Sequence, residues 1–182
     1  NAITAESHTS ATKWLGILFS SIQDNATPIV TGNIITIPET ISYQAPNYTS
    51  GYIVWNVNPV TPLTITYGTV TGGDYGIFVN NWEGYSSNAN NTSIALNGIN
   101  ITGSDIAGVY VKDNPSNTNG ATVYADIQNS VIDSDATGVL VEGADATAKV
   151  NYSDLSNNPT SGATNLNTAV DGASLISADA VF

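Results

Sequence analysis

Three aspartates, Asp74, Asp105 and Asp135, each stand two or three residues before a glycine that opens a short apolar run. If these runs stack on one another, the three carboxylates lie near one corner, with Asp133 adjacent. Carboxylate oxygens are the hard ligands that Ca²⁺ takes, so one prediction is a calcium site, with calcium as the one candidate cofactor. The competing interpretation is that these are turn residues whose side chains bond local backbone N–H groups. We favour the turn interpretation, because Asp before Gly is common turn chemistry and the spacing is not that of a defined calcium loop.

No set of residues with the types and context of a catalytic centre is recognisable in the sequence. There is no Arg and no Cys, and the single imidazole, His8, lies in the polar segment 6–10. Ser and Thr are abundant, but a nucleophile needs a base and an orienting partner, and neither is identifiable. We therefore expect no catalytic residues and a protein that is not an enzyme.

Two aromatic residues, Trp82 and Tyr85, lie in the polar segment 80–91 and have no apolar neighbours in the sequence. Most of the other aromatic residues belong to apolar runs and are explained by core filling. The sequence therefore predicts that Trp82 and Tyr85 contact a glycan or a protein partner.

The charge balance excludes several classes of partner. Fifteen acidic residues oppose three lysines, which gives a net charge of -12. Nothing can form the cationic footprint that nucleic acids require, and no apolar run approaches the ~18 residues needed to span a bilayer. We expect neither nucleic-acid binding nor membrane insertion.

An extracellular location is the expectation from two further features. The sequence lacks Met and begins at Asn1, which fits the removal of a secretion signal. N-x-[ST] sequons are candidate glycosylation sites on a surface protein. They begin at Asn25, Asn47, Asn90, Asn91, Asn100 and Asn151.

An internal repeat organises the chain. A glycine followed by three apolar residues recurs at Gly16, Gly51, Gly76, Gly108 and Gly138, with intervals of 35, 25, 32 and 30 residues. Each run is rich in β-branched or aromatic residues and is bounded by turn formers, which indicates a strand. In segment 10–23, Trp14, Leu15, Leu18, Phe19 and Ile22 would also suit an amphipathic helix, but Gly16 heads the same pattern and favours the strand.

A second strand is predicted midway in each unit, at 63–70, 94–101, 123–132 and 150–155, where apolar residues alternate with polar ones. The turn-rich stretches between strands, such as 80–91 and 112–120, differ in length. A unit this small cannot bury its apolar face alone, so stacking on neighbouring units is expected.

The Gly-headed runs, together with segments 14–19 and 29–37, resemble the right-handed parallel β-helix of pectin-lyase-like proteins. They also resemble the repeats of many secreted bacterial adhesins. The resemblance covers about residues 14–160. It implies an all-β solenoid in which a ladder of stacked apolar side chains points inward. The candidates for this ladder are Ile17, Ile53, Ile77, Val109 and Val139. The basic residues of the family's lyases, and the Asp pairs with His and Arg-Lys elements of its hydrolases, have no counterpart here.

A β-sandwich or jelly roll is the alternative fold, because uneven glycine spacing suits it as well. Parallel pairing of 76–79 with 108–111 would exclude it. In the β-helix interpretation, residues 14–162 form the repeat domain. Residues 1–13 form an N-terminal extension, or a segment that is donated to a neighbouring subunit or caps the solenoid. Residues 163–182 form a C-terminal cap or a partial coil.

Two functional hypotheses follow. The first is an extracellular structural or adhesive protein, a rod or filament subunit whose main partner is itself, since open solenoid ends present unpaired backbone groups. The alternative is a carbohydrate-binding or carbohydrate-active β-helix, of the lyase or depolymerase kind, with glycans as partners.

Overall fold

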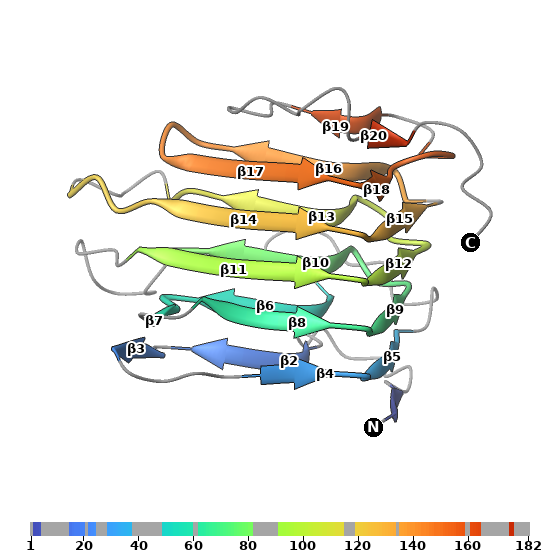
Figure 1. Ribbon diagram of the computed structural model, residues 1–182, viewed down its shortest axis with the longest axis horizontal. Coiled ribbons are helices and arrows are strands. Elements are labelled where there is room, and N and C mark those ends of the chain that lie inside the picture. Colours follow the sequence, from blue (N-terminus) through green and yellow to red (C-terminus); the bar gives the residue numbers. More distant parts are fainter. Residues whose placement is uncertain are drawn as a thin grey trace.

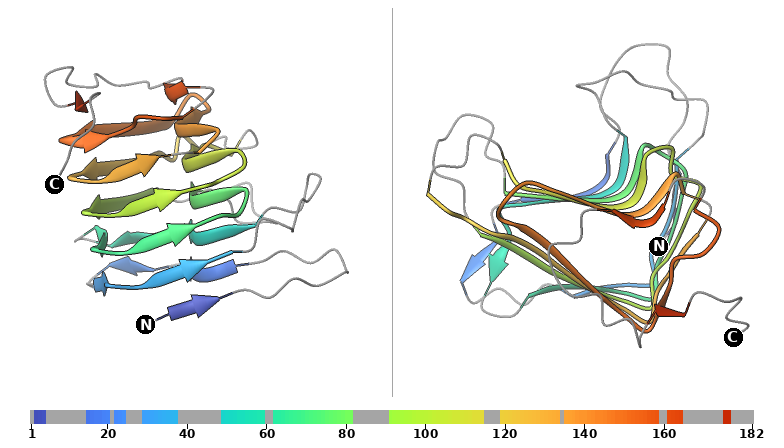
Figure 2. Two further views of the ribbon diagram at one scale, coloured as in Figure 1. Left: turned by 90° about the vertical axis from the view of Figure 1, so that its right-hand side faces the viewer. Right: turned by 90° about the horizontal axis from the view of Figure 1, so that it is seen from above.

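The computed structural model describes residues 2–4, 15–20, 22–24, 29–37, 49–59, 62–81, 91–114, 119–133, 135–158, 161–164 and 175–176. These residues form a right-handed parallel β-helix in which three sheets wind around a common interior (Figure 1). Seen from above, the strands of successive coils superpose (Figure 2). No helix in the described part of the chain is long and apolar enough to cross a membrane.

Each complete coil of the described chain contributes one strand to each sheet, in the order I, II, III. Sheet I contains β2 (Leu15–Ser20), β6 (Ser50–Trp55), β10 (Tyr75–Asn80), β13 (Ala107–Lys112), β16 (Thr137–Glu142) and β19 (Ser161–Thr164). Sheet II contains β4 (Ile29–Thr31), β8 (Leu63–Thr66), β11 (Thr92–Asn97), β14 (Val123–Gln128) and β17 (Ala146–Asn151). Sheet III contains β1 (Ala2–Thr4), β5 (Ile34–Thr36), β9 (Thr69–Thr71), β12 (Asn100–Thr102), β15 (Val131–Asp133), β18 (Ser153–Asp154) and β20 (Leu175–Ile176). Two short strands, β3 (Gln23–Asp24) and β7 (Asn58–Pro59), pair outside these sheets.

The parallel pairing confirms the β-helix and excludes the sandwich. Strand β10 pairs in parallel with β13, with Ile77 opposite Val109. The residues around Gly16 form β2, a strand of sheet I, as the repeat predicted, and not a helix.

The inward ladder of sheet I differs from the prediction at one position. Ile17 pairs with Tyr52, which pairs with Ile77, and that column continues through Val109 and Val139. Tyr52 is fully buried among the core side chains, whereas Ile53 belongs to a separate cluster on the outer face of the sheet. The prediction of Ile53 was wrong because side chains alternate along a strand, so the residue directly after each glycine points inward and the next one outward.

The predicted second strands are each two strands separated by a sharp corner. Between β8 and β9, Tyr67 adopts a positive φ of 52°, and Gly32, Gly98, Asn129 and Tyr152 do the same in the other coils. The N–H groups of the first four corner residues each donate to a backbone carbonyl of the next coil, for example Tyr67 to Asn97 at 3.1 Å. The corner therefore turns the chain from sheet II to sheet III without losing the inter-coil hydrogen bonds.

Close approach between coils explains four of the repeat glycines, Gly16, Gly51, Gly76 and Gly108. A Cβ at Gly76 would lie 2.6 Å from the carbonyl oxygen of Gly108, and it would also collide with Ile101. Their φ values are not positive, so crowding rather than backbone conformation selects glycine.

The segments outside the predicted repeat domain also contribute strands. Strand β1, within 1–13, pairs in parallel with β5 of the same chain. At the other end, β19 pairs with β16 and β20 pairs with β18. Both end segments therefore extend the sheets of their own solenoid.

Candidate functional site

Asp74 lies buried at the corner that leads from sheet III into β10. Its Oδ2 accepts hydrogen bonds from the backbone N–H of Thr49 at 2.7 Å and from the Thr49 hydroxyl at 3.0 Å. Thr49 belongs to the preceding coil, and its Oγ1 accepts the backbone N–H of Asp74 at 2.8 Å. Burial raises the pKa of Asp74, an effect that the Thr49 hydrogen bonds oppose and the charge of Asp105 reinforces. The carboxylate therefore joins two coils.

Asp135 joins coils in the same way further along the solenoid. Its Oδ1 accepts the backbone N–H of Ser104, in the preceding coil, at 2.6 Å, and its own N–H donates to Asn158 Oδ1 at 3.0 Å. Asp135 is fully buried, and its Oδ2 and the Ser104 Oγ lie without a partner in hydrogen-bond geometry. Burial raises the pKa of Asp135 to about 6, against the opposing effect of Ser104.

The predicted calcium column separates into two pairs. The charge of Asp105 acts on Asp74, and that of Asp133 acts on Asp135, but the described residues contain no group of three or more His, Cys, Asp or Glu placed to hold a metal ion. Asp105 is exposed, whereas Asp74 and Asp135 are buried. Hydrogen bonds explain why the two buried carboxylates are tolerated. The groups that donate these bonds belong to the preceding coil and not to the local backbone. Calcium binding stays a prediction.

A buried polar clamp, which the sequence did not reveal, lies beyond the end of β10. Asn81 Nδ2 donates to Asp113 Oδ1 at 2.8 Å and to the carbonyl oxygen of Ala121 at 3.0 Å, and Asn81 Oδ1 accepts the N–H of Asn114 at 2.8 Å. Asn81 is fully buried. This side chain therefore fixes the start and the end of the connection between β13 and β14. An Asn directly after an apolar strand is too common to have marked the position.

The outer face of sheet I carries an apolar and aromatic ladder. Ile53, Phe78 and Tyr110 stand opposite one another in register and are all buried. The Phe78 and Tyr110 rings stack with their centroids 5.2 Å apart, and the centroids of the Tyr75 and Tyr110 rings are 4.8 Å apart. Because both faces of these strands are buried, the runs after each glycine are continuously apolar.

A charged group adjoins this ladder. Lys112 Nζ lies 3.2 Å from Glu142 Oε1 and 5.6 Å from the centre of the Tyr110 ring, and the Tyr110 hydroxyl donates to Glu142 Oε2. The hydrogen bond from Tyr110, with the help of Lys112, lowers the pKa of Glu142. Glu142 is therefore held as a carboxylate at neutral pH, and it is poorly suited to act as a proton donor.

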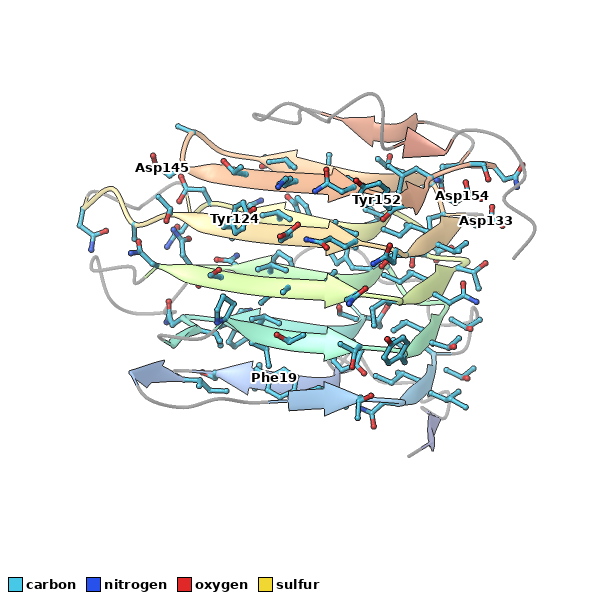
Figure 3. All side chains as sticks on the ribbon, in the orientation of Figure 1. Phe19, Tyr124, Asp133, Asp145, Tyr152 and Asp154 are labelled. Atoms are coloured by element: carbon cyan, nitrogen blue, oxygen red, sulfur yellow. The ribbon has the colours of Figure 1, made fainter. Side chains whose placement is uncertain are left out.

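The open face of sheet II is polar, and Tyr124 lies on it toward the start of β14 (Figure 3). Its outward residues are partly or fully exposed: Thr64, Thr66, Ser93, Ala95, Asn97, Tyr124, Asp126, Gln128, Thr147 and Lys149. Tyr124 lies near Asp126, and burial followed by that negative charge raises the pKa of its phenol. Two further tyrosines, Tyr67 and Tyr152, stand at the corner of this face; the sequence interpretation missed them because it placed each inside a continuous strand.

Six residues considered in the sequence analysis lie outside the described part of the chain: His8, the contact candidates Trp82 and Tyr85, and the sequon residues Asn25, Asn47 and Asn90. Among the described sequons, Asn91 and Asn100 are exposed and Asn151 is buried. Asn91 Oδ1 accepts the backbone N–H of Thr122 at 2.9 Å.

No protein-family model matches this chain, and no curated protein and no solved structure is significantly similar to it.

Proposed function

We propose that this protein is an extracellular, non-catalytic structural or adhesive subunit that associates end to end with copies of itself. One observation carries the proposal, and it concerns the first coil. Ile17, Phe19 and Val30 occupy inward positions, yet they are only partly buried. Their partners in the next coil, Tyr52, Val54 and Ile65, are fully buried.

The incomplete burial has a simple geometric cause. At this end of the solenoid, β2 is the edge strand of sheet I and β4 is the edge strand of sheet II among the described strands. Edge strands offer unpaired backbone groups to another chain, and the apolar side chains beside them favour a partner that buries them.

A second copy of the chain fits this end through its opposite end. All strands of the sheets run parallel, so a coil that stacks head to tail continues every sheet in the same direction. At the opposite end, β17 is the last described strand of sheet II, and Leu155 beside it is partly buried. A head-to-tail contact whose rotation does not close generates a fibre.

The environments of two carboxylates, Asp135 and Glu142, support the proposal that the protein is not catalytic. Asp135 is inaccessible to a substrate, and Glu142 is held in its charged form. The extracellular location is supported by the exposed sequon residues Asn91 and Asn100.

Light scattering and negative-stain microscopy across a range of concentrations test the association. We expect the mass to rise with concentration and rods to appear. Val30→Lys places a charge at the open end and should keep the protein monomeric, while circular dichroism still reports β-structure. Ile34→Lys is the matched control, since Ile34 lies on the outer face of sheet III with 54% of its surface exposed, and it should associate like the wild type. A wild-type protein that stays monomeric at high concentration, or a folded Val30→Lys variant that associates normally, would overturn the proposal.

A further inference from the structure

The corner between sheets II and III holds two tyrosines in a backbone conformation that bulky residues rarely adopt. Tyr67 and Tyr152 have φ values of 52° and 50°, whereas Gly32, Gly98 and Asn129 occupy the equivalent positions of the other coils. Glycine and asparagine tolerate this conformation well, and for a bulky side chain it is an outlier. The turn itself therefore does not require a tyrosine.

Core packing does not require these tyrosines either. Tyr67 is 72% exposed and Tyr152 is 63% exposed, which makes them the most exposed large apolar side chains in the described part of the chain. Figure 3 shows Tyr152 at the edge where β17 meets β18. Because neither the backbone nor the core accounts for them, the strained conformation points to a role at the surface.

The Tyr67 ring lies against the backbone of the next coil. A Cβ on Gly98 would lie 2.9 Å from Tyr67 Cδ1 and 3.1 Å from Cε1, so the ring lies directly over this glycine. A larger residue at Gly98 would displace the ring. An aromatic side chain whose rotamers are restricted by such a contact loses less conformational entropy when a ligand stacks on it.

Neutral polar groups separate the two rings. Asn97, Gln128 and Asn129 lie between the coils of Tyr67 and Tyr152, and Asn129 Nδ2 donates to Asn97 Oδ1 at 2.9 Å. That bond leaves the Asn97 amide N–H groups and the Asn129 carbonyl oxygen for another partner. No residue in this column or at the corner positions between the tyrosines is charged.

We infer that this tyrosine corner, formed by Tyr67, Asn97, Gln128, Asn129 and Tyr152, binds an extended, neutral polysaccharide. Each phenol ring stacks on the apolar face of a sugar ring, and the Asn97 and Asn129 amides between them exchange hydrogen bonds with sugar hydroxyls. The Gln128 amide nitrogen is already used, since it donates to Asp126 Oδ2 at 3.0 Å. The two tyrosines are three coils apart, or roughly 14 Å at the usual strand separation. They therefore contact sugars that are not adjacent, along one chain that runs parallel to the solenoid axis.

Charge disfavours an acidic polysaccharide. The protein has a net charge of -12, and Asp126 and Asp133 lie on the two sheets that flank the corner, so an acidic chain would be repelled. A protein partner is disfavoured, because two separate rings do not make the contiguous apolar patch that such interfaces use. The inference is independent of the end-to-end association, since the corner runs along the side of the solenoid.

Affinity electrophoresis in gels that contain a soluble polysaccharide tests the inference. The probes are hydroxyethylcellulose and xyloglucan as neutral chains, and polygalacturonate as an acidic chain. We expect the neutral chains to retard the wild-type protein and polygalacturonate to leave it unretarded. The double substitution Tyr67→Asn with Tyr152→Asn removes both rings but keeps a residue that the same corner already uses at Asn129, so the fold should survive. This variant should bind the neutral chains about tenfold or more weakly.

Two controls separate loss of the rings from other effects. Tyr67→Phe with Tyr152→Phe keeps both rings and should bind as the wild type does, whereas Tyr124→Ala changes a tyrosine outside the corner and should also bind normally. The inference is overturned if neither neutral chain retards the wild type, if polygalacturonate is preferred, or if the folded double asparagine variant binds like the wild type. Light scattering on the same variants reports association separately, so each proposal can fail alone.

Discussion

At the residue scale, the clearest electrostatic feature is the buried carboxylate of Asp135, in which one oxygen has no hydrogen-bond partner. Its folded-state pKa of about 6 lies above the ordinary value of 3.8, so the folded protein holds this proton more tightly than the unfolded chain does. The stabilisation is fully present below the ordinary pKa and is lost as the pH rises through the folded pKa. The wild type should therefore lose up to about 3 kcal/mol from this group between pH 4 and pH 7.

Asp135→Asn should remove this pH dependence. The amide oxygen can still accept the Ser104 N–H, and the amide nitrogen can donate toward the Ser104 hydroxyl, which is otherwise without a partner. Urea unfolding at pH 4.5 and pH 7 measures the difference for both proteins. An equal loss of stability in the variant and the wild type would show that other groups carry the pH dependence.

The repeat glycines make a second prediction at this scale. A Cβ at Gly108 would lie 2.5 Å from Asp135 Oδ2 and would collide with Ile132. Gly108→Ala should therefore lower the free energy of unfolding by about 1–3 kcal/mol. Gly120→Asn is the control, because Gly120 is exposed, no atom crowds its Cβ position, and asparagine tolerates its φ of 70°. Similar losses in both variants would contradict the role of close inter-coil contact.

At the element scale, the connection between β13 and β14 depends on Asn81, which lies one coil earlier. Asn81→Ala would remove three hydrogen bonds and leave buried partners unsatisfied, so we expect a loss of about 2–4 kcal/mol. Limited proteolysis should then cut between 113 and 122 faster than in the wild type. Asn100→Ala, at an exposed position in β12, is the matched control for stability. Unchanged proteolysis at this connection would show that other contacts hold it.

The elements were predictable to different degrees for physical reasons. The runs after Gly76 and Gly108 identified sheet I because strands buried on both faces are continuously apolar. The same property concealed their orientation, so Ile53 was placed inward where Tyr52 belongs. The corner at Tyr67 could not be predicted, because apolar and polar residues alternate on both sides of it. A tyrosine also gives no signal for a positive φ.

At the scale of the whole molecule, the sequence predicted the all-β solenoid but little of the candidate sites. Stacking was predictable from the repeat, since each unit lacks enough residues to bury its own apolar face. The roles of Asp74 and Asp135 were only partly predictable, because their partners Thr49 and Ser104 lie in another coil. The tyrosine corner was not predictable, because it joins side chains that are 85 residues apart in the sequence, from Tyr67 to Tyr152.

The parallel stacking also determines how the chain folds. The paired strands are between 22 and 35 residues apart in the sequence, at both ends of the solenoid and in its middle. Absolute contact order is therefore nearly independent of the number of coils, and a longer array of such coils would not form contacts more distant in sequence. Folding can nucleate on one pair of coils and propagate to the next, so its cooperativity is that of nearest neighbours in a one-dimensional array.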